Sequence, residues 1–223
     1  MIRDPMRTFI GIDGIPGAWV AVYLAKNQQY FDYGDLDRLL AISYERAMID
    51  VPIGLPLRGY RTCDVEAREH VRSRVFLGAR WNVWLFESYK NANDRYWSSD
   101  DKGISKQLWG IRDKLKEVNE VMTPERQSRL METHPELVFW RLNGRKYLEN
   151  KKTDAGRTQR IELLERHGFN KIGKWLGLRY GTGIRRDDLI DACACALAAR
   201  NSKERFPNGD PQKARGIRME IWY

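Results

Sequence analysis

Five acidic residues stand at positions where their side chains could bind a metal ion. Asp13 and Asp50 each end an apolar run, and Glu136 follows a third apolar run by a few residues. Asp188 and Asp191 lie near the start of an alanine-rich segment, three residues apart, a spacing that puts both on one face of a helix. Carboxylates gathered at one place repel each other unless a cation joins them. Oxygen ligands suit Mg²⁺ or Mn²⁺, so the pattern predicts a divalent-metal site of the kind that assists phosphoryl displacement.

Each of these acids, taken singly, has a simpler structural explanation. Asp187 and Asp188 could cap the helix that follows and interact favourably with its dipole. Asp13 could be an ordinary turn residue, and Glu136 could occupy the first turn of a helix that begins at Pro135. The metal hypothesis therefore depends on their joint placement after separate strands.

His134 is the histidine closest to these acids in the sequence. It could act as a general acid or base, orient a phosphate, or form a hydrogen bond in the loop before Pro135. The last role is the one we favour.

The elements that would position the acids follow an α/β pattern. Apolar or alternating runs predict strands at residues 8–13, 18–26, 29–33, 46–51 and 129–133. The first three form an antiparallel meander, and a helix predicted at 35–42 leads to the fourth, which suits a parallel pairing of the fourth strand beside the first. Asp13 and Asp50 would then meet at the edge where open α/β sheets place their ligands.

Further helices are predicted at 64–74, 105–121, 158–167 and 186–200, and a last strand at 217–223. The region 77–103 is aromatic and reads as irregular. We interpret residues 1–223 as a single domain with helical or irregular insertions at about 57–128 and 141–186.

The positive charge of the chain is concentrated in one segment. The sequence holds 39 Lys and Arg against 30 Asp and Glu, a formal net charge of +9. Residues 141–186 hold 13 basic and 4 acidic side chains and so account for the whole excess. Such a segment is typical of a protein that binds a polyanion, although a solvated basic helix face is the simpler alternative. Within it, Lys151, Lys152, Arg157 and Arg160 are the predicted contacts to the backbone phosphates of DNA or RNA.

Composition excludes several other classes of protein. A hydrophobic content of 42% is enough for a packed core and excludes a disordered or fibrous chain. No stretch approaches the roughly 20 apolar residues of a membrane span, and the first residues lack the apolar run of a signal peptide. The three cysteines show no CxxC spacing, which excludes a disulfide framework and a zinc-finger-type site. We therefore expect a soluble, cytoplasmic protein with no membrane partner.

Seven short segments, spread in order from about residue 8 to the C-terminus, together resemble a known family. They are GIDG at 11–14, DVPIGLP at 50–56, RTCD at 61–64 with Ala67 and Arg68, HPE at 134–136, KKT at 151–153, DDLIDA at 187–192 and MEIW at 219–222. The set resembles the family called domain of unknown function 429, which is classed as predicted RNase-H-like nucleases.

The resemblance implies an RNase-H-like fold, which is a five-stranded mixed sheet with three antiparallel strands and then two parallel ones, flanked by helices. It also implies acids at the ends of strands one and four and on a late helix. These map onto Asp13, Asp50 and Asp188 or Asp191, with Glu136 as a further candidate. The implied activity is hydrolysis of nucleic-acid phosphodiesters with Mg²⁺ or Mn²⁺. The segment WNVW at 81–84 departs from the Ser-rich segment expected there.

Two other functions stay open at this point. A nucleic-acid-binding module with the same fold and no catalysis would use the same basic segment. A nucleotide phosphotransferase or ATPase of the actin-like superfamily would need two copies of the fold, whereas 223 residues without a repeat have room for one. The sequence makes no prediction of the oligomeric state.

Overall fold

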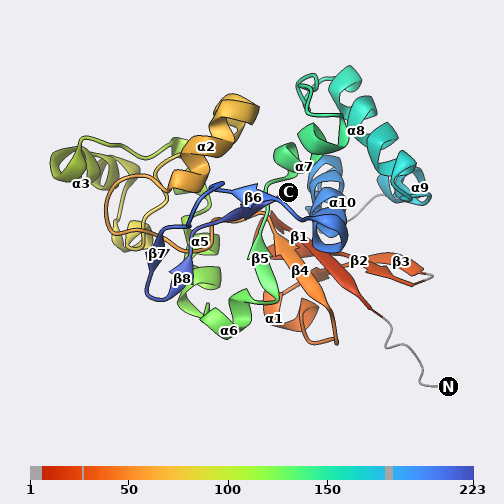
Figure 1. Ribbon diagram of the computed structural model, residues 1–223, viewed down its shortest axis with the longest axis horizontal. Helices are drawn as coiled ribbons and strands as arrows, with labels where there is room; N and C mark the ends of the chain where they lie inside the picture. Colours follow the sequence, from red (N-terminus) through yellow and green to blue (C-terminus); the bar gives the residue numbers. More distant parts are fainter. Residues whose placement is uncertain (1–6, 27, 179–182) are drawn as a thin grey trace. The chain divides into compact units, whose positions relative to one another are not determined.

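A computed structural model describes residues 7–26, 28–178 and 183–223 (Figure 1). The chain divides into two compact units. Unit 1 comprises the residues up to Asp50, the segment Arg129–Lys203 and Tyr223, and unit 2 comprises Val51–Ser128 and Glu204–Trp222. All the acids and basic residues predicted to form the site belong to unit 1.

Unit 1 is built on a five-stranded mixed sheet with the order β3-β2-β1-β4-β5. Its strands are β1 (Phe9–Ile15), β2 (Ala18–Ala25), β3 (Gln28–Gly34), β4 (Arg46–Ile49) and β5 (Leu130–Glu132). β1, β2 and β3 are antiparallel neighbours, whereas β4 pairs in parallel with both β1 and β5. This arrangement confirms the predicted sheet and is consistent with the RNase-H-like fold.

The strands of the sheet follow the burial that their sequences predict. The interiors of β1, β2 and β4 are buried on both faces, in keeping with their continuous apolar runs. β3 is the edge strand, and exposed residues recur along it. β1 runs two residues beyond Asp13, so this acid lies within the strand and not after it as the sequence predicted.

The helices of unit 1 are α1 (Leu36–Leu39), α7 (Pro135–Leu142), α8 (Asp154–Arg166), α9 (Ile172–Leu176) and α10 (Arg186–Asn201). α10 packs across β1, β2 and β4 and also contacts α7, α8 and α9 (Figure 1). Its residues from Leu189 to Ala199 are all buried, including the free thiols of Cys193 and Cys195.

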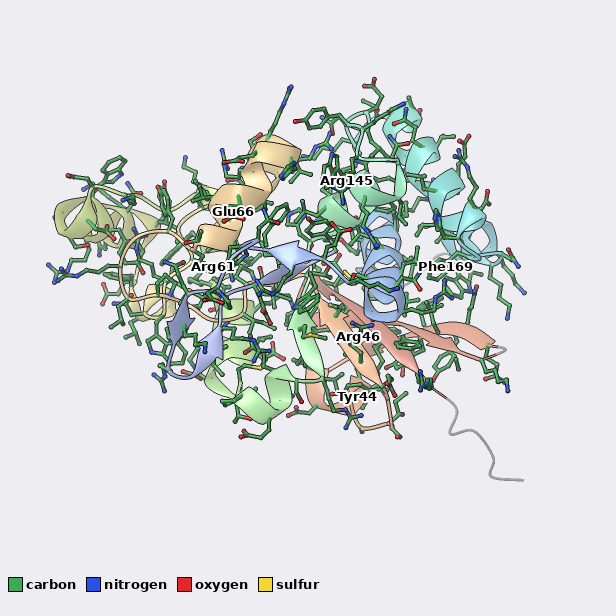
Figure 2. All side chains as sticks on the ribbon, in the orientation of Figure 1. Tyr44, Arg46, Arg61, Glu66, Arg145 and Phe169 are labelled. Carbon is green, nitrogen blue, oxygen red and sulfur yellow. The ribbon has the colours of Figure 1, made fainter. Side chains whose placement is uncertain are left out.

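Small residues let α10 lie against the sheet at backbone distance. A Cβ atom at Gly11 of β1 would overlap the backbone of Ala192 and Ala196 in α10, so glycine is required at this position. At the other end of the contact, Arg46 at the start of β4 donates from Nε to the carbonyl oxygen of Ala199 over 2.6 Å (Figure 2). These two contacts fix α10 relative to β1 and β4. They thereby determine where Asp188 and Asp191, in the first two turns of α10, lie relative to the sheet.

Unit 2 is mainly helical. Its helices are α2 (Thr62–Val71), α3 (Tyr89–Asp100), α4 (Lys106–Gly110), α5 (Arg112–Glu120) and α6 (Pro124–Gln127), with short 3₁₀ helices η1 (Arg72–Arg74) and η2 (Val83–Leu85). Its strands form two antiparallel pairs, β6 (Arg205–Phe206) with β9 (Ile221–Trp222) and β7 (Lys213–Ala214) with β8 (Ile217–Arg218). Buried Arg61 donates from Nε to Asp64 over 2.9 Å and from Nη1 to the Ile53 carbonyl over 3.1 Å, which fixes the proline-rich loop after Asp50 within this unit.

Several predicted elements differ from the observed ones. The helix predicted at 105–121 is two helices, α4 and α5, that meet at Ile111 after the poor helix former Gly110. The region 77–103, predicted to be irregular, contains α3, and the last strand predicted at 217–223 is split between β8 and β9. Within the described ranges, no helix has the length and apolarity needed to cross a membrane.

Candidate functional site

Asp13, Asp50 and Asp191 come together on the side of the sheet that α10 covers. Asp13 follows Gly11 by two residues in β1, so both residues face α10. Asp50 directly follows β4, and its backbone N–H donates to the Ile12 carbonyl over 3.0 Å, which holds it beside β1. Asp191 lies in the second turn of α10. We call these three carboxylates the acidic cluster.

The members of the acidic cluster perturb one another. Burial raises the pKa of Asp13 well above its ordinary value, and the charges of Asp50, Asp191 and Asp188 raise it further. Burial also raises the pKa of Asp50, against the opposing influence of His134 and Lys151. Such mutual effects require short distances between carboxyl groups in a poorly solvated place, so the structure brings together acids that lie far apart in the sequence.

Asp191 is the most enclosed member of the acidic cluster, with 4% of its surface exposed. Burial raises its pKa to about 6, although the ammonium group of Lys151 acts in the opposite direction. Its Oδ2 accepts a hydrogen bond from Lys151 Nζ at 2.6 Å. Its Oδ1 is buried and has no hydrogen-bond partner among the described residues.

Lys151 supplies a positive charge at the acidic cluster. Burial alone would lower the pKa of its ammonium group, but Asp191, Asp50 and Asp13 together raise it above its ordinary value. The sequence predicted Lys151 as a contact to a phosphate, whereas the structure places its amino group on Asp191. Lys151 and Lys152 are adjacent in the sequence, and nothing in the sequence indicates which of the two side chains would point toward the acidic cluster.

Asp188 lies at the margin of the acidic cluster and has a structural role as well. Its Oδ2 accepts a hydrogen bond from the backbone N–H of Arg185 at 2.8 Å at the start of α10, which is the capping contact considered from the sequence. Burial raises its pKa, and the bond from Arg185 lowers it. Asp187 points elsewhere and lies 3.6 Å from Arg157 Nε.

Glu136 forms a buried ion pair with Arg160. Arg160 donates from Nε to Oε1 over 3.0 Å and from Nη2 to Oε2 over 2.8 Å, and its side chain is 1% exposed. Both oxygens of Glu136 are thus engaged, although its charge still acts on Asp50 and Asp191. The interior position of Arg160 leaves its guanidinium group no exposed surface for the phosphate contact predicted from the sequence.

His134 is the residue that caps α7. Its Nδ1 accepts the backbone N–H of Glu136 at 3.2 Å. This is a hydrogen bond of the kind favoured from the sequence, although its donor lies in the first turn of α7 and not in the loop before Pro135. The ring also lies near enough to Asp50 to lower the pKa of that carboxyl group. His134 therefore links the first turn of α7 to the acidic cluster.

The other predicted phosphate contacts differ in exposure. Lys152 is exposed, and Arg157 is 27% exposed and donates from Nη1 to Asp154 over 3.1 Å. Arg145, in the same basic segment, is exposed after the end of α7 (Figure 2). These side chains, unlike Arg160, are placed where a polyanion could reach them.

The chemistry of the acidic cluster suits a divalent cation, but the side chains do not form a ready coordination shell. Nowhere in residues 7–26, 28–178 and 183–223 are three or more His, Cys, Asp or Glu side chains arranged to hold a metal ion. The donors are nevertheless oxygens of the type that Mg²⁺ and Mn²⁺ prefer. The Oδ1 atom of Asp191 is buried and accepts no hydrogen bond from the described residues, and burial together with the neighbouring acids raises the pKa of Asp13. The residues therefore fit a divalent ion by chemistry.

Comparison with known proteins identifies the family to which the sequence is similar. A family model described as "Protein of unknown function (DUF429)" matches residues 11–212. No curated protein and no solved structure gave a significant match.

Proposed function

The chain belongs to the DUF429 family, and we propose from its acidic cluster that it is a metal-dependent nuclease. One observation carries this proposal. Carboxyl groups from β1, from the end of β4 and from α10 share a buried place, and their pKa values are raised even though the ammonium group of Lys151 lies among them. Buried carboxylates that repel one another are stabilised by the binding of a cation.

Asp13, Asp50 and Asp191 are the residues that would hold a divalent ion, with Asp188 at the margin. A bound divalent ion supplies Lewis-acid stabilisation of negative charge on phosphate oxygens and makes a water molecule a better nucleophile. Glu136 does not fit this ligand set, because Arg160 engages both of its oxygens. We assign it instead to holding the first turn of α7 beside the cluster.

Lys152 and Arg157 would contact the sugar–phosphate backbone of the substrate, DNA or RNA. Contacts of this kind position a nucleic acid without reading its sequence. We therefore expect cleavage with little sequence preference. We propose the cytoplasm as the place of action, because all three cysteines are free thiols.

A cleavage assay tests the proposed function. Single-stranded, double-stranded and branched DNA and RNA are incubated with the protein in Mg²⁺, in Mn²⁺ and in a chelator. Asp13→Asn should reduce the cleavage rate by about 100-fold or more, as loss of one electrostatic stabiliser does in other enzymes, and should leave oligonucleotide binding largely intact. Glu165→Gln, a change of an exposed acid on α8, is the matched control and should cleave like the wild type. Cleavage that survives the chelator or Asp13→Asn would contradict the proposal.

A nucleic-acid-binding module without catalysis is the second candidate. The ion pair of Lys151 with Asp191 favours it, because this ammonium group already neutralises part of the cluster. The lack of a ready metal-holding group in the described part of the chain favours it too. A pure binding module would bind oligonucleotides with a steep salt dependence, and neither Mg²⁺ nor Asp13→Asn would change that binding.

A further inference from the structure

The amino group of Lys151 lies at the acidic cluster and brings a positive charge to it. Its Nζ lies 2.6 Å from Oδ2 of Asp191, whose side chain is 5% exposed. The same ammonium group acts on Asp13 and Asp50, so it serves all three members of the acidic cluster. An ammonium group is a compact point charge on a flexible stem, and in this respect it substitutes for a metal ion.

The backbone around Lys151 is fixed by contacts from α8. Arg160 donates from Nη1 to the carbonyl oxygens of Glu149 and Gly156 over 3.0 and 2.6 Å. A Cβ atom at Gly156 would overlap the carbonyl of Asn150, so glycine lets the loop lie directly on the first turn of α8. These contacts fix the position of the backbone from which the Lys151 side chain extends to Asp191.

The side chain of Lys151 is partly exposed, which leaves it a path into solvent. It is 38% exposed although its ammonium group contacts a nearly buried carboxylate. Rotation about the four-carbon stem would carry the charge into solvent without a change in the backbone. The ion pair can thus open at the cost of one side-chain movement.

We propose that Lys151 competes with a divalent metal ion for Asp191. The ammonium group neutralises part of the acidic cluster in the metal-free protein and leaves the carboxylate of Asp191 when the ion binds. This inference rests on the metal site of the proposed function, but not on cleavage. It predicts that the lysine weakens metal binding, whereas a lysine that merely supported the carboxylates would strengthen it.

Calorimetric titration with Mn²⁺ tests the competition. Lys151→Met keeps an unbranched side chain, shorter by one atom, and removes its charge. Lys152→Met is the matched control, because Lys152 is the neighbouring lysine and is exposed. We expect Lys151→Met to bind Mn²⁺ about tenfold or more tightly than the wild type, and Lys152→Met to bind like the wild type.

The outcomes separate this inference from the proposed function. Equal or weaker binding by Lys151→Met overturns the competition and leaves the nuclease proposal standing. Tighter binding by Lys151→Met in a protein that cleaves no substrate supports the competition and overturns the nuclease proposal. No Mn²⁺ binding by any of the three proteins overturns both.

If circular dichroism shows that Lys151→Met does not fold, a second experiment on the wild-type protein tests the competition. The protein is treated briefly with an amine-acylating reagent, with and without Mg²⁺, and modification is measured by peptide mass spectrometry. Displacement from Asp191 should increase the acylation of Lys151 at least several-fold, while Lys152 reacts equally in both samples. An unchanged ratio of the two lysines would overturn the competition.

Discussion

At the scale of single residues, the carboxyl group of Asp13 opposes folding at neutral pH. Its folded-state pKa is raised by burial and by the neighbouring acids, so the folded protein binds its proton more tightly than the unfolded chain does. A group of this kind supports folding fully below its unfolded pKa, and the support is lost as the pH rises through its folded pKa.

The first prediction concerns Asp13→Asn in the absence of metal. Because asparagine carries no charge, this change should raise the free energy of unfolding at about pH 7 by roughly 1–3 kcal/mol, the scale of a poorly compensated buried charged group. The gain should shrink at about pH 4, where the unfolded group is itself partly protonated. Urea unfolding at both pH values measures the effect, with Glu165→Gln as the control that should change little. A loss of stability at neutral pH would show that the charge of Asp13 is well compensated.

The second prediction compares two arginines of α8. Arg160→Met leaves the carboxylate of Glu136 buried without its partner, and we expect a loss of about 3–5 kcal/mol in the free energy of unfolding. Arg166→Met is the matched control because its pair with Glu162 is solvent-exposed, at 66% and 52%, and it should cost less than about 1 kcal/mol. The double change Arg160→Met/Glu136→Leu should recover part of the loss. Similar losses in the free energy of unfolding for the two changes would show that the buried pair of Arg160 with Glu136 contributes no more to stability than the exposed pair of Arg166 with Glu162.

The sequence proposed five acids for one site, and the structure divides them. Glu136 pairs with Arg160, and Asp188 accepts a hydrogen bond from the backbone of Arg185. Asp13, Asp50 and Asp191 could be found because each is tied to an element that sequence periodicity reveals. The pairs of Lys151 with Asp191 and of Arg160 with Glu136 join residues 40 and 24 positions apart. Periodicity indicates the face on which a side chain lies, but not which distant residue that face meets.

At the scale of elements, the contact between α10 and β1 determines whether the acidic cluster forms at all. The third prediction is that Gly11→Ala pushes α10 away from the sheet, because the added Cβ overlaps the backbone of Ala192 and Ala196. We expect a loss of about 1–3 kcal/mol or more in the free energy of unfolding and weaker Mn²⁺ binding. Gly173→Ala on α9 is the control, since a Cβ there meets nothing within 4 Å. Unchanged Mn²⁺ binding in Gly11→Ala would show that α10 can shift without disturbing the cluster.

Elements with a strong pattern could be predicted, and those without one could not. The buried strands and the alanine-rich α10 were evident from their composition. α3 was missed because its sequence, YKNANDRYWSSD, is polar with few apolar positions, and only Ala92 and Tyr96 are buried. α8 begins at Asp154, four residues before the predicted start, because the hydroxyl of Thr153 accepts the backbone N–H of Gly156 at 3.1 Å.

At the scale of the whole molecule, the formal charge of +9 is confined to one segment of the sequence. The fourth prediction is that oligonucleotide affinity falls linearly with salt on logarithmic axes, as backbone binding requires. Lys152→Ala should reduce the slope by about 0.7–0.9, the share of one phosphate contact. Lys203→Ala, an exposed lysine outside residues 141–186, should leave the slope unchanged. Equal effects of the two lysines would mean that net charge alone governs binding.

The positions of the three cysteines make it possible to follow the opening of each compact unit separately in the intact chain. Cys193 and Cys195 are sealed inside unit 1 on α10, and Cys63 is sealed inside unit 2 on α2. A thiol-alkylating reagent reaches a sealed sulfur atom only after the surrounding structure opens. The alkylation rates of the two groups of peptides would therefore coincide if the chain opens as a whole, and differ if one unit opens while the other stays closed. The native cysteines thus report on the two units separately, and no label has to be engineered to learn which unit unfolds first.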